Sequence, residues 1–281
     1  MNTTGMMSRL VLACGAMVFS VSSLAPVRAE PRLPDFTGVW GRDAHNYPKP
    51  YMSGGAGRNA TVTDGYNNAY LKPWVVELLM RDNLVEQSGH ATVTAHSACY
   101  PEGIPYVFGG TQIQILQTPT EITMLFGDPG QSRTIYLNRP HSPHVVPSWY
   151  GESVGHFEGD SLVVDTIGIA VNPQAGSMGF FGTPHTEALH VVERYRYLAA
   201  GEKSLAPRPR NDSFDASAVI AGGKTLRLSF TLDDPGAYRK PWSVTLDYLP
   251  LSSHIREYVC AENEPDADLA PMLPTADIPD F

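Results

Sequence analysis

Apolar and polar residues alternate with a period of two in one short segment after another from residue 112 onward. The segments are 112–118, 121–126, 133–138, 152–157, 161–169, 189–198, 225–233, 242–249 and 255–260. Successive side chains of a β-strand point to opposite faces, so this alternation predicts a series of half-buried strands. The turn sequences TPT at 118–120 and EGD at 158–160 predict hairpins between neighbouring strands.

A helical pattern occurs once, in residues 71–87 (LKPWVVELLMRDNLVEQ). Its apolar residues recur on one face, and Pro73 suits a first turn. Residues 36–40 are one more short strand candidate. One helix followed by about nine strands predicts a mainly β fold, either an antiparallel β-barrel or a sandwich of the lipocalin or calycin kind, with one N-terminal helix.

The two ends of the chain differ from this central part. Residues 1–29 have the features of a secretory signal peptide: Arg9, an apolar run over 10–24 and the small-residue cleavage site VRA at 27–29. We therefore expect export to the periplasm or secretion, a single β-rich domain over 30–262, and an acidic, Pro-rich tail over 263–281. No later stretch approaches the roughly 20 apolar residues that span a bilayer, so no membrane span is expected.

The charge of the chain excludes one class of partner. The formal net charge is −9, and it becomes −11 without the signal peptide, which holds Arg9 and Arg28 and no acid. An acidic chain without a basic stripe is a poor nucleic-acid binder. Because neither a dinucleotide-binding glycine motif nor a P-loop is present, no cofactor is predicted.

Two cysteines, Cys99 and Cys260, remain once the signal peptide is removed. In an oxidising compartment such a pair predicts a disulfide, and two free buried thiols are the alternative. A loop of this length would stabilise the fold by on the order of 4–5 kcal/mol. Zinc would need more ligands than two cysteines offer.

The sequence GESVG at 151–155 matches the G-x-S-x-G pattern of the serine-hydrolase nucleophile elbow. The elbow requires a strand before the serine and a helix after it. Here the pattern is followed by EGD and then by the strand candidate 161–169. Ser153 is therefore expected within the first arm of a hairpin, where Gly151 and Gly155 permit a bulge or a close backbone approach.

Glu193 is the strongest candidate for a functional residue. In segment 189–198 it shares the apolar face with Leu189, Val191, Tyr195 and Tyr197, which predicts that it points into the barrel. A buried carboxylate must be paired or protonated, and a raised pKa would suit a general acid or base. The alternative is a structural ion pair, for instance with Arg139. His190 falls on the opposite face and is expected to be exposed.

Four further residues belong to the predicted site. Asp165 lies among aliphatic residues as a second acid, or as a structural hairpin partner. His156 shares a face with Val154 and is expected to line the interior. Arg139 continues the face of Ile135 and Leu137 and is expected at the barrel mouth. Arg139 or Tyr136 would stabilise developing negative charge.

The loop PHSPH at 140–144 supplies His141 as a candidate substrate contact. Its two histidines, His141 and His144, have the H-x-x-H spacing, but Pro140 and Pro143 forbid the helix that would put both on one face. A three-histidine site with His156 is an alternative. We predict no metal.

Several motifs together resemble a large group of exported bacterial proteins, many of unknown function. They include PDFTGVW at 34–40, GxSxGxxEGDxLVVDT at 151–166 and YxCxEN at 258–263. The resemblance covers most of the chain after the signal peptide and implies export. It carries over no catalytic residue and no reaction.

Two functions are consistent with these features. The first is an exported, cofactor-independent lyase, hydratase or isomerase that acts on a small hydrophobic or aromatic molecule, with Glu193 and Asp165 or His156 moving a proton. The second is a lipocalin-like periplasmic ligand-binding protein without catalysis. A hollow interior would favour chemistry at Glu193, whereas a filled interior would move the function to the loops around His141.

Overall fold

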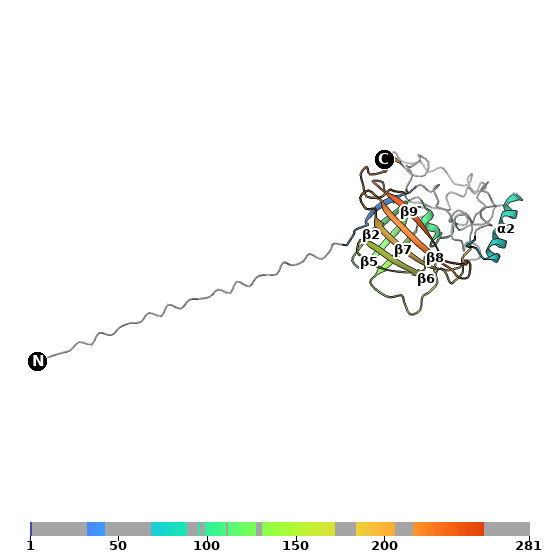
Figure 1. The fold of residues 1–281 in the computed structure, drawn as a ribbon, viewed down its shortest axis with the longest axis horizontal. Helices are drawn as coiled ribbons and strands as arrows, with labels where there is room; N and C mark the ends of the chain where they lie inside the picture. Colours follow the sequence, from blue (N-terminus) through green and yellow to red (C-terminus); the bar gives the residue numbers. More distant parts are fainter. Residues whose placement is uncertain are drawn as a thin grey trace, which may run out of the picture. The chain divides into compact units, whose positions relative to one another are not determined.

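Nine strands form a closed barrel in the computed structural model, which describes residues 1, 33–42, 69–88, 95, 99–110, 112–127, 131–171, 184–205 and 216–255 (Figure 1). The strands are β1 (Gly38–Gly41), β2 (Gln112–Gln117), β3 (Glu121–Phe126), β4 (Ser132–Leu137), β5 (Glu152–Glu158), β6 (Ser161–Ile167), β7 (His190–Tyr197), β8 (Leu226–Asp233) and β9 (Trp242–Leu251). The helical elements are α2 (Pro73–Gln87), η1 (Tyr106–Gly109) and η2 (Ala216–Ala218). The predicted mainly β fold is confirmed, and a barrel is the form that it takes.

Each strand of the barrel pairs with its neighbours in the sequence, and β1 closes the ring by pairing with β9. All pairs are antiparallel except β4 and β5, which run parallel from Ile135↔Ser153 to Leu137↔Gly155. The predicted antiparallel pairing therefore holds for every pair of the barrel except this one. Parallel neighbours need a long connection, here residues 138–151, which we call the β4–β5 connection.

The predicted hairpins and strand limits agree closely with the structure. Residues 118–120 and 158–160 connect antiparallel partners, and Gly159 takes the positive φ of 62° that its turn requires. The segment predicted over 36–40 forms β1. Residues 256–260 of the last predicted strand lie outside the described residues, as do 2–29 and 263–281.

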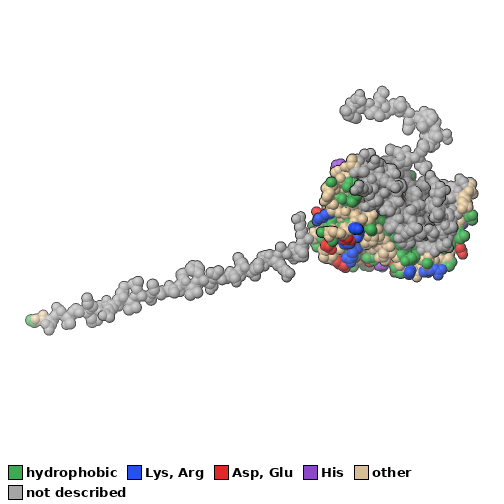
Figure 2. All heavy atoms as spheres, turned by 45° about the horizontal axis from the view of Figure 1, so that its top comes forward, with side chains coloured by type: hydrophobic (Ala, Val, Ile, Leu, Met, Phe, Trp, Pro, Cys, Tyr) green, Lys and Arg blue, Asp and Glu red, His purple; other side chains and the backbone are tan. Residues whose placement is uncertain are grey.

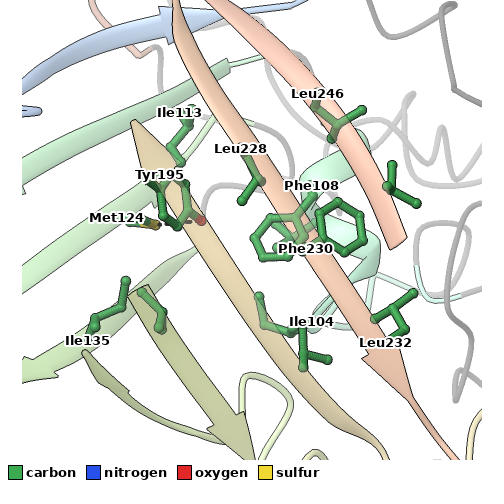
Figure 3. Close-up of a cluster of buried hydrophobic side chains, with 14 of the residues drawn as sticks. Ile104, Phe108, Ile113, Met124, Ile135, Tyr195, Leu228, Phe230, Leu232 and Leu246 are labelled. Carbon is green, nitrogen blue, oxygen red and sulfur yellow. Dashed lines mark hydrogen bonds between the residues drawn. The ribbon is translucent and has the colours of Figure 1, made fainter. Parts of the chain in front are cut away.

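The barrel interior holds a segment that precedes β2. Ile104 and Phe108 are each 1% exposed and lie among the inward side chains of the strands (Figure 3). The Phe108 ring packs against Phe230 of β8, with 5.0 Å between the ring centroids. These side chains occupy interior space that a lipocalin-like barrel would offer to a ligand.

The helix α2 lies outside the barrel (Figure 1). Val75 and Leu79 are buried in the same core as the strands, whereas Trp74 is 41% exposed and donates a hydrogen bond from its indole Nε1 to the Gly236 carbonyl. Among the described helices, none has the length and apolar character needed to cross a membrane.

The outer surface of the barrel carries charges of both signs. Arg196 and Arg227 both pair with Glu202, and Arg227 also pairs with Asp247 at 2.7 Å. The hydrogen bonds from Arg196 lower the pKa of Glu202 to about 2. On the face seen in Figure 2, Lys and Arg side chains lie beside Asp and Glu side chains.

Candidate functional site

Glu193 points into the barrel, as its position in the strand predicted. Its side chain is completely buried, and it forms an ion pair with Arg133 of β4, whose Nη2 lies 2.6 Å from Oε1 and whose Nη1 lies 2.8 Å from Oε2. The structural ion pair was expected with Arg139, for instance, and this partner is wrong. A bidentate pair of this kind fixes both side chains and neutralises both charges.

Hydroxyl groups complete the hydrogen bonding around this pair. Tyr195 donates to Glu193 Oε2 at 2.8 Å, and Thr166 lies 3.3 Å from Oε1. Arg133 donates to Ser153 Oγ from Nε at 3.0 Å and from Nη2 at 2.8 Å. Both carboxylate oxygens of Glu193 are therefore occupied, which favours the structural alternative over a free acid or base.

The electrostatic environment of this cluster holds the arginine charged and the tyrosine neutral. Burial alone would lower the pKa of Arg133, but the adjacent Glu193 carboxylate outweighs it and raises the pKa. Burial and the same carboxylate raise the pKa of Tyr195 well above its usual value. The Tyr195 hydroxyl therefore keeps its proton and remains a hydrogen-bond donor.

Ser153 is not placed as a nucleophile. It lies within β5 and is 2% exposed, with its Oγ occupied by Arg133. Gly155 allows the close approach expected of it, because a Cβ there would meet Ile135 Cγ2 at 3.0 Å. The interpretation of GESVG as part of a hairpin arm is confirmed.

The expected position of Arg139, on the inward face of Ile135 and Leu137, is wrong, and Tyr136 lies on the outer face. Arg133, Ile135 and Leu137 are the inward residues of β4, so Tyr136 points outward and is 37% exposed. Asn138 has a positive φ of 56°, which ends the strand and breaks the alternation before Arg139. Arg139 lies over the outer face of Tyr136, with 3.7 Å between its Cζ and the ring centroid.

His156 and Asp165 also lie on the outer face of the barrel, so the expected interior position of His156 is wrong. The inward residues of β5 are Ser153 and Gly155, and the His156 side chain is 55% exposed beside Glu158. Asp165 is 40% exposed on β6. The structure therefore separates both residues from Glu193 and does not bring the predicted catalytic set together.

The outer face instead carries a row of four titratable residues that the sequence did not predict as a group. His141 Nδ1 lies 3.0 Å from Glu152 Oε1, and its Nε2 lies 2.8 Å from Asp165 Oδ1. His190 Nε2 lies 2.8 Å from Asp165 Oδ2. These residues come from the β4–β5 connection, β5, β6 and β7, and we call them the outer row.

Both carboxyl groups of the outer row are stabilised in their charged form. Hydrogen bonds from Ser142 and, to a smaller extent, His141 lower the pKa of Glu152. Partial burial would raise the pKa of Asp165, but hydrogen bonds from His141 and His190 outweigh it and lower the pKa. Their negative charges are thus part of the folded structure.

Acid is expected to destabilise the protein through these two groups. A carboxyl whose pKa is lower in the folded state contributes stability above its unfolded pKa of about 4, and that stability is lost as the pH falls through the folded pKa. The variant Glu152→Gln should therefore lose less free energy of unfolding than the native protein between pH 7 and pH 3. Urea unfolding at both pH values measures this difference. The exposed Glu187→Gln is the control, and an equal acid loss in the native protein and Glu152→Gln would contradict the assignment.

Next to the outer row is a cleft of ≈ 450 Å³ on the outside of the barrel. One wall is the outer face of β4, and the other is the β4–β5 connection. Its lining residues are Ser132, Arg133, Thr134, Tyr136, Ser142, His144, Val146, Ser148, Tyr150, Gly151, Glu152 and Ser153. The cleft reaches Arg133 and Ser153 because β5 pairs with β4 only from Ile135 onward.

Two further predictions concern a three-histidine metal site and a disulfide. Within the described ranges, no group of three or more His, Cys, Asp or Glu side chains could hold a metal ion. His144 lines the cleft, whereas His141 and His156 each contact carboxylates. Cys260 lies outside the described residues, so its pairing with Cys99 stays a prediction.

Comparison with known proteins provides no relative from which a role could be transferred. No family model, no curated protein and no solved structure matches the chain. Membership of the group of exported bacterial proteins therefore stays a prediction.

Proposed function

We propose that this is an exported protein that binds a small polar molecule in the cleft between β4 and the β4–β5 connection. The observation that carries the proposal is the cleft itself, whose volume of ≈ 450 Å³ lies within the range of small-molecule sites. The β-barrel is compatible with ligand binding, and it provides a rigid wall for the cleft. Export rests on the signal-peptide features and on the resemblance described above.

The barrel interior gives less support to a ligand site. Ile104 and Phe108 occupy it, and the inward charges Arg133 and Glu193 neutralise each other. A filled interior moves the proposed function outward, to the region of His141. This differs from a lipocalin-like carrier, which holds its ligand inside the barrel.

The chemistry of the cleft favours a ligand that forms hydrogen bonds. Besides Ser153, six of its lining residues carry hydroxyl groups: Ser132, Thr134, Tyr136, Ser142, Ser148 and Tyr150. His144 also lines the cleft. Its ring can bond to a ligand, because its side chain makes no hydrogen bond within the part of the chain that the structure describes. We therefore propose a polar ligand in place of the hydrophobic molecule that the strand pattern suggested.

Acid–base catalysis at the same cleft is the second candidate. The observation in its favour is the outer row, in which carboxylates and imidazoles alternate and Glu152 also lines the cleft. Histidines oriented by carboxylates are common general bases. Turnover of a bound compound that disappears in Glu152→Gln, with binding retained, would favour this candidate.

Filling the cleft tests the binding proposal directly. Thr134 points outward from the middle of β4, and Thr134→Trp should occupy the cleft without changing the core. We expect chemical-shift changes at 132–136 and 142–153 when a panel of polar metabolites is added to the native protein. These changes should be lost in Thr134→Trp.

The matched control is Thr231→Trp on the outer face of β8, four strands away in the ring. It should bind as the native protein does. A compound that binds the native protein and Thr134→Trp equally well, or that perturbs only the interior residues, would contradict the proposed site.

A further inference from the structure

His141 lies between two carboxylates, and this position restricts how its ring can be hydrogen-bonded. Its Nδ1 contacts Glu152 at 3.0 Å and its Nε2 contacts Asp165 at 2.8 Å. Ionised carboxylates only accept hydrogen bonds, and a neutral imidazole has a single N–H. Both contacts are hydrogen bonds at the same time only when the ring carries two protons and a positive charge.

His141 is one of the side chains that attach the β4–β5 connection to the strands, together with Ser142 and, through its ion pair with Glu152, Arg139. Its ends are held by backbone hydrogen bonds, from Asn138 to the Gly155 carbonyl at 2.8 Å and from Ser148 to the Gly168 carbonyl at 3.0 Å. Between these ends, within the described residues, only His141 and Ser142 form hydrogen bonds with the strands. Ser142 donates its amide to Glu152 Oε1 at 2.6 Å, beside the His141 contact.

We infer that His141 is a pH-sensitive latch that holds the outer wall of the cleft against β5 and β6 while its ring carries two protons. When the ring loses one proton, one of its nitrogens presents a lone pair to a carboxylate at hydrogen-bond distance. That contact becomes repulsive, and the attachment of the wall weakens, leaving the hydrogen bonds from Ser142 to Glu152. The latch rests on the geometry of His141, and its effect on ligand binding rests on the proposed function.

Four other charged or titratable groups face the latch. Glu152 approaches from β5, Asp165 from β6, and His190 from β7 through the second oxygen of Asp165. Arg139, on the connection itself, lies 4.0 Å from Glu152 and is 45% exposed. Protonation of the two carboxylates at low pH would remove the same contacts, so the latch is tested above that range.

The latch is tested without any ligand, so its outcome is separate from that of the binding proposal. The ring nitrogens of ¹⁵N-labelled histidines report by NMR when His141 changes from two protons to one. The hydrogen-exchange protection factor of the Ser142 amide reports whether the wall is attached. In the native protein we expect both to change over the same pH range, with protection falling about tenfold or more as the pH rises from 5.5 to 8.5.

Three variants distinguish His141 from its neighbours. His141→Gln keeps one donor but cannot bridge two carboxylates, so Ser142 protection should be low and independent of pH. His156→Gln removes an exposed histidine–carboxylate pair on the same strand as Glu152, and it should behave as the native protein. His190→Gln leaves both His141 contacts in place and should keep the pH-dependent change.

Two results would overturn the inference. One is a native Ser142 protection factor that stays constant while the His141 ring changes charge. The other is native protection in His141→Gln with an intact barrel, as judged by exchange at Val191. Should His141→Gln not fold, the native titration decides the question alone.

Discussion

Replacing Glu193 with leucine is expected to reduce the free energy of unfolding by about 3–5 kcal/mol, because Arg133 would remain buried without its counter-charge. The guanidinium cannot lose its proton, so the charge stays in an apolar interior at every accessible pH. Urea unfolding of the native protein and the variant measures the loss. The loss should be nearly the same between pH 5 and pH 8.

The reverse change, Arg133→Met, separates charge burial from lost packing. It leaves Glu193 as the unpaired group, and a carboxyl can take up a proton whereas an arginine cannot. The loss of free energy of unfolding caused by Arg133→Met should therefore become smaller as the pH is lowered. The double variant Arg133→Met with Glu193→Leu should lose less free energy of unfolding than Glu193→Leu alone, since no charge remains buried. Additive losses in this double-mutant cycle, or a loss below about 1 kcal/mol for Glu193→Leu, would contradict a tightly coupled pair.

The variant Phe108→Ala is expected to reduce the free energy of unfolding by about 3–5 kcal/mol, because it removes a ring from the barrel core. Phe108 is 1% exposed, packs against Phe230 and lies 5.8 Å below the Arg133 guanidinium carbon. The ring therefore fills space between the apolar and the charged parts of the interior. The loss is measured by urea unfolding.

A control and a rescue experiment sharpen this prediction. Phe157→Ala, at a half-buried position of β5, should reduce the free energy of unfolding clearly less than Phe108→Ala does. A cavity lined by apolar side chains can accept benzene, so benzene should restore part of the stability of Phe108→Ala and none of that of Phe157→Ala. A loss for Phe108→Ala no larger than for Phe157→Ala would show that Phe108 is not a central part of the core.

The β class of the fold was predictable because the period of two persists along most of the chain. Glu193 was predictable for the same reason, since its neighbours at alternate positions are apolar on one face only. The same reasoning, extended backward along β4 from Ile135, places Arg133 on the inward face. Arg139 falls on the same face by alternation alone, but the positive φ of Asn138, which no pattern in the sequence indicates, interrupts the strand before it.

The faces of β5 and β6 were harder to assign from the sequence. In β6 the inward residues include Val164 and the outward residues include Val163, so hydrophobicity does not distinguish them. In β5 the inward residues Ser153 and Gly155 are small because they accommodate Arg133 and Ile135. That requirement comes from a neighbouring strand and leaves no signal within β5 itself.

The outer row was beyond prediction for another reason. It combines residues from three strands with His141 of the β4–β5 connection, and the pairing of β5, β6 and β7 alone does not place that connection. Only the path of residues 138–151 over the outer face brings His141 to Asp165 and Glu152. The individual residues were visible as candidates, but their arrangement required the three-dimensional structure.

The parallel contact between β4 and β5 follows from simple counting. In a closed barrel, every strand can run opposite to both of its neighbours only if the number of strands is even, and this barrel has nine strands. At least one adjacent pair must therefore point the same way, and the chain must travel back along the wall to begin the second member of that pair. This return path forms one side of the cleft, so in this molecule the odd strand number and the external recess have a common origin.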